Sequence, residues 1–127
     1  MLVIIFSTHT PLQRAARQNP SAEVLKALVS AGADVDARND FQQTPLHEAA
    51  GSNPTNVQPL IDCGANVNLL EMRRFSPLLL AANNNDRDAI VALAKAGADP
   101  ELGESPLDAG GANDETKSLI RSLFKIK

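Results

Sequence analysis

The chain has 127 residues, about the length of one domain, and its 43% content of hydrophobic residues is sufficient for a folded core. Its net charge is −3, and basic and aromatic residues do not alternate along it, so we expect neither nucleic acid nor an anionic membrane as a partner. The single cysteine cannot form an internal disulfide, so we expect a reducing compartment, the cytoplasm. One cysteine and two histidines are a weak indication of a metal site, and we expect no bound cofactor.

The chain begins with the apolar segment MLVIIF, Met1–Phe6. No basic segment precedes it and no small-residue cleavage site follows, so it predicts neither a secretion signal nor a membrane span. We expect this segment to fold back over the first helices as a cap. The alternatives are that it pairs with a second copy of the chain, giving a homo-oligomer, or that it marks truncation from a longer protein.

A helix-start motif recurs along the chain. The oxygen of Thr or Ser accepts a hydrogen bond from the first turn of a helix, and proline suits the first helical position because it has no N–H to leave unbonded. Paired alanines follow in three copies and predict close contact between helices. The spacing is roughly 33 residues. The copies are TPLQRAA from Thr10, TPLHEAA from Thr44, SPLLLAA from Ser76 and SPLDAGG from Ser105.

A second helix is predicted before each of three glycines, Gly32, Gly64 and Gly97, which supply the left-handed residue that ends it. Counting back from each glycine, apolar residues recur at a helical spacing and predict a buried stripe. About eight residues then lead to the next Thr/Ser-Pro motif. Each unit is therefore helix, turn, helix and an extended loop, here called a finger. The stripe residues are Leu25, Leu28 and Val29; Val57, Leu60 and Ile61; and Ile90, Leu93 and Ala94.

These units resemble ankyrin repeats, whose pattern is approximately D-x-x-G-x-T-P-L-H-x-A-A, a second helix with I-V and L-L pairs, and G-A-D-V-N. The resemblance covers roughly residues 9 to 124. It implies a single all-α domain over residues 1–127, an ankyrin-repeat solenoid with short β-hairpin fingers and repeats at about 7–38, 39–70, 71–101 and 102–127. Gln42 and Arg74 replace the glycine at the fingertip, the last finger is short, and Gly110–Gly111 replace the last alanines.

Pro59 falls inside the predicted second helix of the second unit. Proline in a helix interior costs about 3 kcal/mol, because its missing N–H leaves the Thr55 carbonyl without a donor. We expect this helix to kink or to begin late, the second repeat to be the least regular, and Pro59→Ala to be stabilising.

The last helix, TKSLIRSLFKI, is expected to close the end of the solenoid as a cap. Its apolar residues recur at helical spacing and should face inward, while its basic residues should face water. The inward set is Leu119, Ile120, Leu123 and Phe124, and the outward set is Lys117, Arg121 and Lys125.

The pair His47–Glu48 within TPLHEAA raises the question of catalysis. A zinc-protease helix needs a second histidine four residues after the first, and position 51 is Gly51. The resemblance implies that His47 is a structural residue, hydrogen-bonded within and between repeats. The alternative is a metal-dependent enzyme or regulator that uses His47, Glu48 and the loop Asn83–Asp86.

The resemblance implies a protein-protein interaction module or adaptor, not an enzyme, that binds a protein partner on its concave surface of fingers and first helices. The second finger combines Met, Phe, Leu and Arg, and Met, Phe and Arg are enriched at interfaces. In the alternative, Leu69 and Leu70 pack under the finger and Phe75 covers its own repeat. The expected contact residues are Arg38, Asp40, Phe41, Gln43, Glu48, Leu70, Met72, Arg73, Arg74, Phe75 and Leu80.

Overall fold

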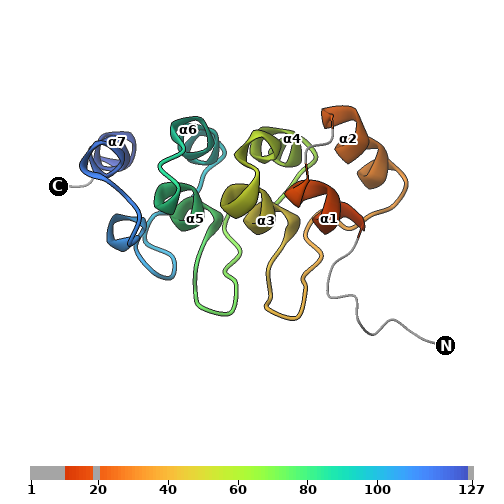
Figure 1. The fold of residues 1–127 in the computed structure, drawn as a ribbon, viewed down its shortest axis with the longest axis horizontal. Coiled ribbons are helices and arrows are strands. Elements are labelled where there is room, and N and C mark those ends of the chain that lie inside the picture. Colours follow the sequence, from red (N-terminus) through yellow and green to blue (C-terminus); the bar gives the residue numbers. More distant parts are fainter. Residues whose placement is uncertain (1–10, 19–20, 126–127) are drawn as a thin grey trace.

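The computed structural model describes residues 11–18 and 21–125, and every regular element in these ranges is helical. Figure 1 shows two rows of helices, an inner row of α1, α3 and α5 and an outer row of α2, α4, α6 and α7, with loops extending beyond the inner row. This is the predicted solenoid. The bounds are α1 (Pro11–Arg17), α2 (Ala22–Ser30), α3 (Pro45–Ser52), η1 (Pro54–Asn56), α4 (Val57–Asp62), α5 (Pro77–Asn83), α6 (Arg87–Lys95), η2 (Pro106–Asp108) and α7 (Asp114–Phe124).

Two parts of the sequence pattern fall outside these ranges: Met1–Phe6, with its expected cap or pairing role, and the first helix-start residue Thr10. Within the part that the structure describes, none of the helices has the length and apolar character needed to cross a bilayer.

The Thr/Ser-Pro motifs begin inner helices, as predicted. The hydroxyl of Thr44 accepts from the backbone N–H of His47 at 3.3 Å, and that of Ser76 accepts from Leu79 at 3.1 Å. Ser105 also accepts a first-turn N–H, from Leu107, but it starts only the 3-10 turn η2. The alanines that belong in the next turn are Gly110 and Gly111 here, and glycine disfavours helix. The fourth unit therefore lacks a full inner helix.

The outer helices α2, α4 and α6 end in the same way. Gly32, Gly64 and Gly97 have φ values of 107°, 95° and 94°, in the left-handed region where glycine has no side-chain clash. Each glycine N–H and the next N–H bond back to the helix, as in Gly32 N to Val29 O and Ala33 N to Leu28 O. This pair of hydrogen bonds closes the helix end and turns the chain toward the finger.

The core lies between the two rows and is built from small and branched aliphatic residues. The alanine pairs of α1, α3 and α5 are buried, so neighbouring inner helices pack directly against each other. The outer row contributes fully buried Leu25, Leu60, Ile90 and Leu93. The sequence predicted these buried faces because apolar residues recur at helical spacing within each helix and at equivalent positions from one repeat to the next.

The fingers are tight turns, and the expected β-hairpins are not confirmed, since residues 11–18 and 21–125 include no β-strand. In the first finger Gln42 N donates to Asn39 O, and in the second Arg74 N donates to Glu71 O, each at 2.9 Å. The fingertip residues Gln42 and Arg74 have φ values of 64° and 68°, which explains why the family pattern has glycine there.

A buried side chain on each of the first two inner helices bonds to the next finger along the chain. His47 accepts from Thr44 N through Nδ1 at 3.1 Å, which leaves the proton on Nε2, and Nε2 donates to Phe75 O at 3.0 Å. Gln13 occupies the same position in α1 and donates through Nε2 to Gln43 O at 2.7 Å. Burial lowers the pKa of His47 to about 4. The structural role that the resemblance implied for His47 is confirmed.

Helix α4 begins late, as one of the two expected outcomes for Pro59. It has 6 residues, against 9 in α2 and in α6, and the 3-10 turn η1 precedes it. Pro59 is its third residue, so the missing N–H falls in the first turn, where no intrahelical acceptor is needed. The predicted cost of an interior proline is therefore absent. Among the three units with two α-helices, the second is the least regular.

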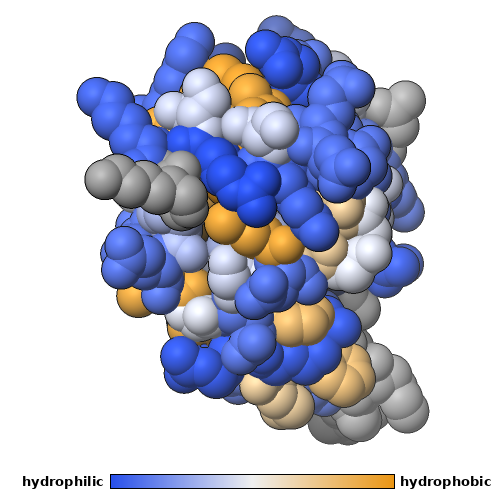
Figure 2. Space-filling view, turned by 90° about the vertical axis from the view of Figure 1, so that its left-hand side faces the viewer, coloured by the Kyte–Doolittle hydropathy of each residue, from blue (hydrophilic) through white to orange (hydrophobic). Residues whose placement is uncertain are grey.

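Helix α7 covers the end of the solenoid that faces the viewer in Figure 2. Its inward and outward residues differ in part from the expected sets. Ile120 is fully buried and Leu119 and Phe124 are half-buried, as predicted. Leu123 was expected to point inward but is exposed, and Lys117, expected in water, is half-buried. Thr116 is the other buried residue of α7, and its hydroxyl donates to Asn85 Oδ1 at 2.7 Å.

Replacing Pro59 with alanine should change the free energy of unfolding by less than about 1 kcal/mol, and not raise it by the roughly 3 kcal/mol of an interior proline. The reason is its place in the first turn of α4, where alanine gains little helix stability and makes the unfolded chain more flexible. Urea unfolding measures the change. Leu60→Ala in the same helix removes a fully buried side chain and should cost about 2–5 kcal/mol as the control. A gain of several kcal/mol in Pro59→Ala would contradict this placement.

The stability of the protein should depend on pH through His47. Its pKa in the folded state, about 4, is below the ordinary 6.5, so the unfolded chain takes up the proton first as the pH falls. The contribution of His47 to the free energy of unfolding is complete above pH 6.5 and is lost as the pH falls from 6.5 to about 4. Between pH 7.5 and pH 5 this loss is about 2 kcal/mol. The nearby charges oppose one another, since Glu71 raises the pKa and Arg38 lowers it.

His47→Gln tests this dependence because Gln13 shows that glutamine fits the position. Urea unfolding at pH 7.5 and pH 5 should show the loss of about 2 kcal/mol in the wild type and not in the variant. His9 is present in both proteins, so it does not affect the comparison. Equal pH slopes in the two proteins would disprove the role assigned to His47.

Candidate functional site

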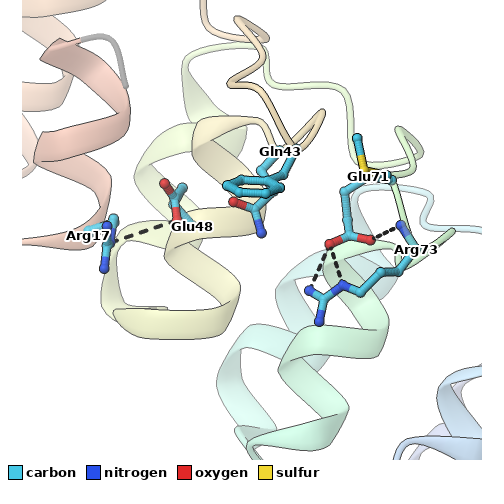
Figure 3. Close-up of a pocket in the computed structure, with 7 residues that line it drawn as sticks. Arg17, Gln43, Glu48, Glu71 and Arg73 are labelled. Carbon is cyan, nitrogen blue, oxygen red and sulfur yellow. Dashed lines mark hydrogen bonds and ion pairs between the residues drawn. The ribbon is translucent and has the colours of Figure 1, made fainter. Parts of the chain in front are cut away.

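A groove of about 540 Å³ lies on the concave side, between the first two fingers and the inner helices α1 and α3. Figure 3 shows its walls: Arg17 and Glu48 face each other from α1 and α3, and Gln43, Glu71 and Arg73 come from the fingers. The structure thus brings together several of the residues predicted for partner contact. The lining is Arg17, Phe41, Gln43, Glu48, Glu71, Met72 and Arg73.

The two fingers are held together at the groove by their backbones. Met72 N donates to Phe41 O at 3.0 Å, which places the two residues next to each other. Phe41 is 57% exposed and Met72 62%, the highest values among the large hydrophobic residues described. Exposed apolar side chains at one place are typical of a contact surface, because they contribute nothing to the core.

Arg73 is fixed in place by two interactions. Its Nε and Nη2 donate to Glu71 Oε2 at 2.9 and 2.7 Å, and its guanidinium lies 4.4 Å from the centre of the Phe75 ring. Burial raises the pKa of Glu71, but the hydrogen bonds and positive charge of Arg73 outweigh it and hold that pKa below its usual range. Glu71 is therefore an ionised, buried partner of a surface arginine.

Arg17 and Glu71 are groove residues that the sequence prediction missed. Arg17 Nε lies 3.8 Å from Glu48 Oε1, across the contact of α1 with α3. This pair joins residues 31 positions apart, and no repeat spacing reveals it. Glu71 did carry a signal, because it occupies the aspartate position of the pattern D-x-x-G-x-T-P, which Asn39 fills in the first finger.

A second hollow of about 320 Å³ adjoins the groove on the other side of Arg73. It contains two more of the predicted residues, Phe75 and Leu80, both half-buried. Here Leu79 replaces the histidine or glutamine of the earlier inner helices, so its side chain has no donor for the third finger. The lining is Arg73, Phe75, Leu79, Leu80, Asn83, Glu104, Ser105, Asp108, Ala109 and Gly110.

The other predicted contact residues, Arg38, Asp40, Leu70 and Arg74, line neither hollow. Arg38 Nη1 donates to Leu70 O at 3.2 Å, which links the first finger to the second. Leu70 is half-buried, and its side chain lies so close to Gly103 that an added Cβ there would be 2.8 Å away. Asp40 and Arg74 are exposed in the fingers. Leu70 thus packs against the third finger, and its predicted partner contact stays a prediction.

The residues of the enzyme hypothesis have structural partners. His47 is buried and bonded at both ring nitrogens. In the loop Asn83–Asp86, the side-chain oxygens accept backbone N–H groups: Asn83 from Gly111, Asn85 from Asn113 and Asp86 from Ala89. No cluster of three or more His, Cys, Asp or Glu side chains suited to a metal occurs among the described residues. The geometry gives this hypothesis no support.

The comparisons with known proteins agree on the kind of repeat. A family model described as ankyrin repeats matches residues 12–104 in three copies. The chain is 37% identical to human BCL-6 corepressor-like protein 1 over 94 residues, and this stretch covers 73% of this chain and 5% of that protein. It is 34% identical over 90 residues to human ankyrin repeat and SOCS box protein 3, covering 68% and 17%. The chain thus spans a small part of these relatives.

A solved structure shows the same fold. The crystal structure of the human ASB11 ankyrin repeat domain superposes with a TM-score of 0.78 and 24% sequence identity, covering 92% of this chain and 54% of that one. Ankyrin repeats are in general protein-protein interaction modules and not enzymes. With the repeated helix pairs and the matched residues 12–104, the chain belongs to the ankyrin-repeat family.

Proposed function

We propose that this chain is an interaction module that binds a protein partner in the concave groove between its first two fingers. The observation that carries the proposal is the pair Phe41 and Met72, which the bond between the fingers holds side by side and exposed over the groove. Both residues lie at finger positions where the repeat pattern requires no apolar side chain. We also propose a cytoplasmic location, on the ground of the single cysteine.

The composition of the groove suits a partner protein better than a small molecule. It is open, and it combines one aromatic and one thioether side chain with arginines, residue types that are enriched in interfaces. The chain has no Trp or Tyr and four Phe, so Phe41 is one of few aromatic anchors available. We place the main contact on Phe41, Met72 and Arg73 and the edge of the surface on Arg38, Asp40 and Arg74.

Phe41→Ala/Met72→Ala tests the proposal. Because both side chains are mostly exposed, the double variant should unfold within about 1 kcal/mol of the wild type. Used as bait in a lysate of the source organism, with quantitative mass spectrometry, it should retain partners at least about tenfold less than the wild type. The matched control is Val24→Ala, an exposed apolar side chain on α2 in the outer row.

If the folded double variant captures the same proteins with the same yield as the wild type, the groove is not the binding surface. Arg73→Ala/Phe75→Ala then shows whether the second hollow binds the partner instead, since both residues line it.

A further inference from the structure

We propose that the groove recognises an extended peptide segment of another protein in which an apolar side chain is flanked by acidic side chains. This inference rests on the proposed function and names the chemistry of the partner. It is drawn from the order of groups along the groove, with a guanidinium toward each end and the apolar pair Phe41 and Met72 among its lining.

The apolar part of the segment is determined by Phe41 and Met72. The bond from Met72 N to Phe41 O keeps the two residues adjacent, and both line the groove, so an apolar side chain bound there can contact both. Methionine adapts its shape to what it contacts, and the aromatic ring offers a large rigid area. Burying two mostly exposed apolar side chains on binding is favourable in proportion to the area removed from water.

The acidic part is determined by the charges that the groove exposes. Glu48 and Glu71, its two carboxylates, are buried, whereas the arginines that face them, Arg17 and Arg73, have side chains 52% and 58% exposed. A ligand therefore contacts guanidinium groups and not carboxylates. This surface contrasts with the net charge of −3 for the whole chain. The charge exposed in the groove is complementary to Asp or Glu.

Arg73 is prepared for such a contact. Its bonds to Glu71 use Nε and Nη2, and the Phe75 ring holds its plane, so Nη1 can donate to a second carboxylate without ordering the side chain anew. Charge-assisted bonds of this kind are stronger than neutral ones. Exposed Arg38 and Arg74 add positive charge in the first two fingers, where Asp40 is the one exposed acid.

Two other occupants fit part of this chemistry. A single-stranded nucleic acid would also meet arginines and an aromatic ring, but the net negative charge of the chain opposes a polyanion. A second copy of the chain could offer its third finger, where Leu102 is exposed between Glu101 and Glu104. Binding measurements can separate both from a peptide of another protein.

The experiment is selection of short random peptides, displayed on phage, on the wild-type chain. We expect enrichment of peptides with Asp or Glu on both sides of a Leu, Ile, Met or Phe. A synthetic peptide of the enriched sequence, followed by fluorescence anisotropy, should bind at least about tenfold more weakly when its acidic residues are replaced by lysine or its apolar residue by serine. Its affinity should also fall as salt increases.

Variants locate the binding. Met72→Ser and Arg17→Gln, each at an exposed side chain, should both weaken the peptide about tenfold, while Leu123→Ser and Arg121→Gln on α7 should leave it unchanged. Circular dichroism checks that each variant is folded. Enrichment of basic peptides, no enrichment, or binding that Met72→Ser and Arg17→Gln leave intact would overturn the inference.

Three outcomes separate the remaining explanations. Self-association in light scattering that Leu102→Ser abolishes would identify the third finger of a second copy as the occupant and overturn the claim of another protein. Tighter binding of single-stranded oligonucleotide than of the selected peptide would overturn it in favour of nucleic acid. If the selection yields no peptides of the expected acidic and apolar composition while Phe41→Ala/Met72→Ala still loses its captured proteins, the proposed function stands and only the inferred partner class is wrong.

Discussion

The arrangement of the concave surface depends on one buried hydrogen bond that is repeated along the stack. Gln13 and His47, at the same position of successive inner helices, each donate to the last carbonyl of the next finger, at 2.7 and 3.0 Å. A buried carbonyl without a donor costs about 1–3 kcal/mol, so the finger has one favourable position relative to the helix. Because the finger starts the next helix through Thr44 or Ser76, the same bond also sets where that helix lies.

The third inner helix lacks this donor, and the stack changes at that point. Leu79 occupies the position, and its side chain lies in the wall of the second hollow beside Glu104. The third finger is shorter, and its bond to the second finger remains, since Glu104 N donates to Arg74 O at 2.9 Å. Beyond it the chain makes the turn η2 and then α7. The loss of the donor, the short finger and the reduced fourth unit thus occur together, where the repeat gives way to a cap.

The repeated parts of the structure could be predicted from the sequence, since they depend on local chemistry. Thr44 with Pro45 starts a helix and Gly64 ends one through hydrogen bonds between near neighbours, so the residue types alone identify them. For the late start of α4 the sequence offered two outcomes for Pro59, and η1 selects the second. The positions of Leu123 and Lys117 were predicted wrongly because the last helix packs on one side only, against α6 and η2, and the face that these two elements cover differs from the apolar stripe of the sequence.

The candidate site could be predicted only in part, for a different reason. Variable finger positions indicated Phe41, Met72 and Arg73, because residue type and place in the repeat are both visible in the sequence. The ion pair of Arg17 with Glu48 depends on the relative rotation of two helices, and no motif records that rotation. Which charges are exposed is likewise a property of packing, since the carboxylates of Glu48 and Glu71 are buried in the groove while Arg17 and Arg73 are about half exposed.

The two fingers show how a different residue at one structural position can order a side chain of the groove. In the first finger the neutral Asn39 closes the turn by itself, with Oδ1 accepting from Phe41 N and Gln43 N at 2.8 and 3.0 Å. In the second finger Glu71 takes this place and accepts from Arg73 N at 2.6 Å. A buried carboxylate also needs a positive partner, so it binds the side chain of Arg73 and holds it beside Phe75. The group that closes the second finger therefore also orders the arginine that faces the groove.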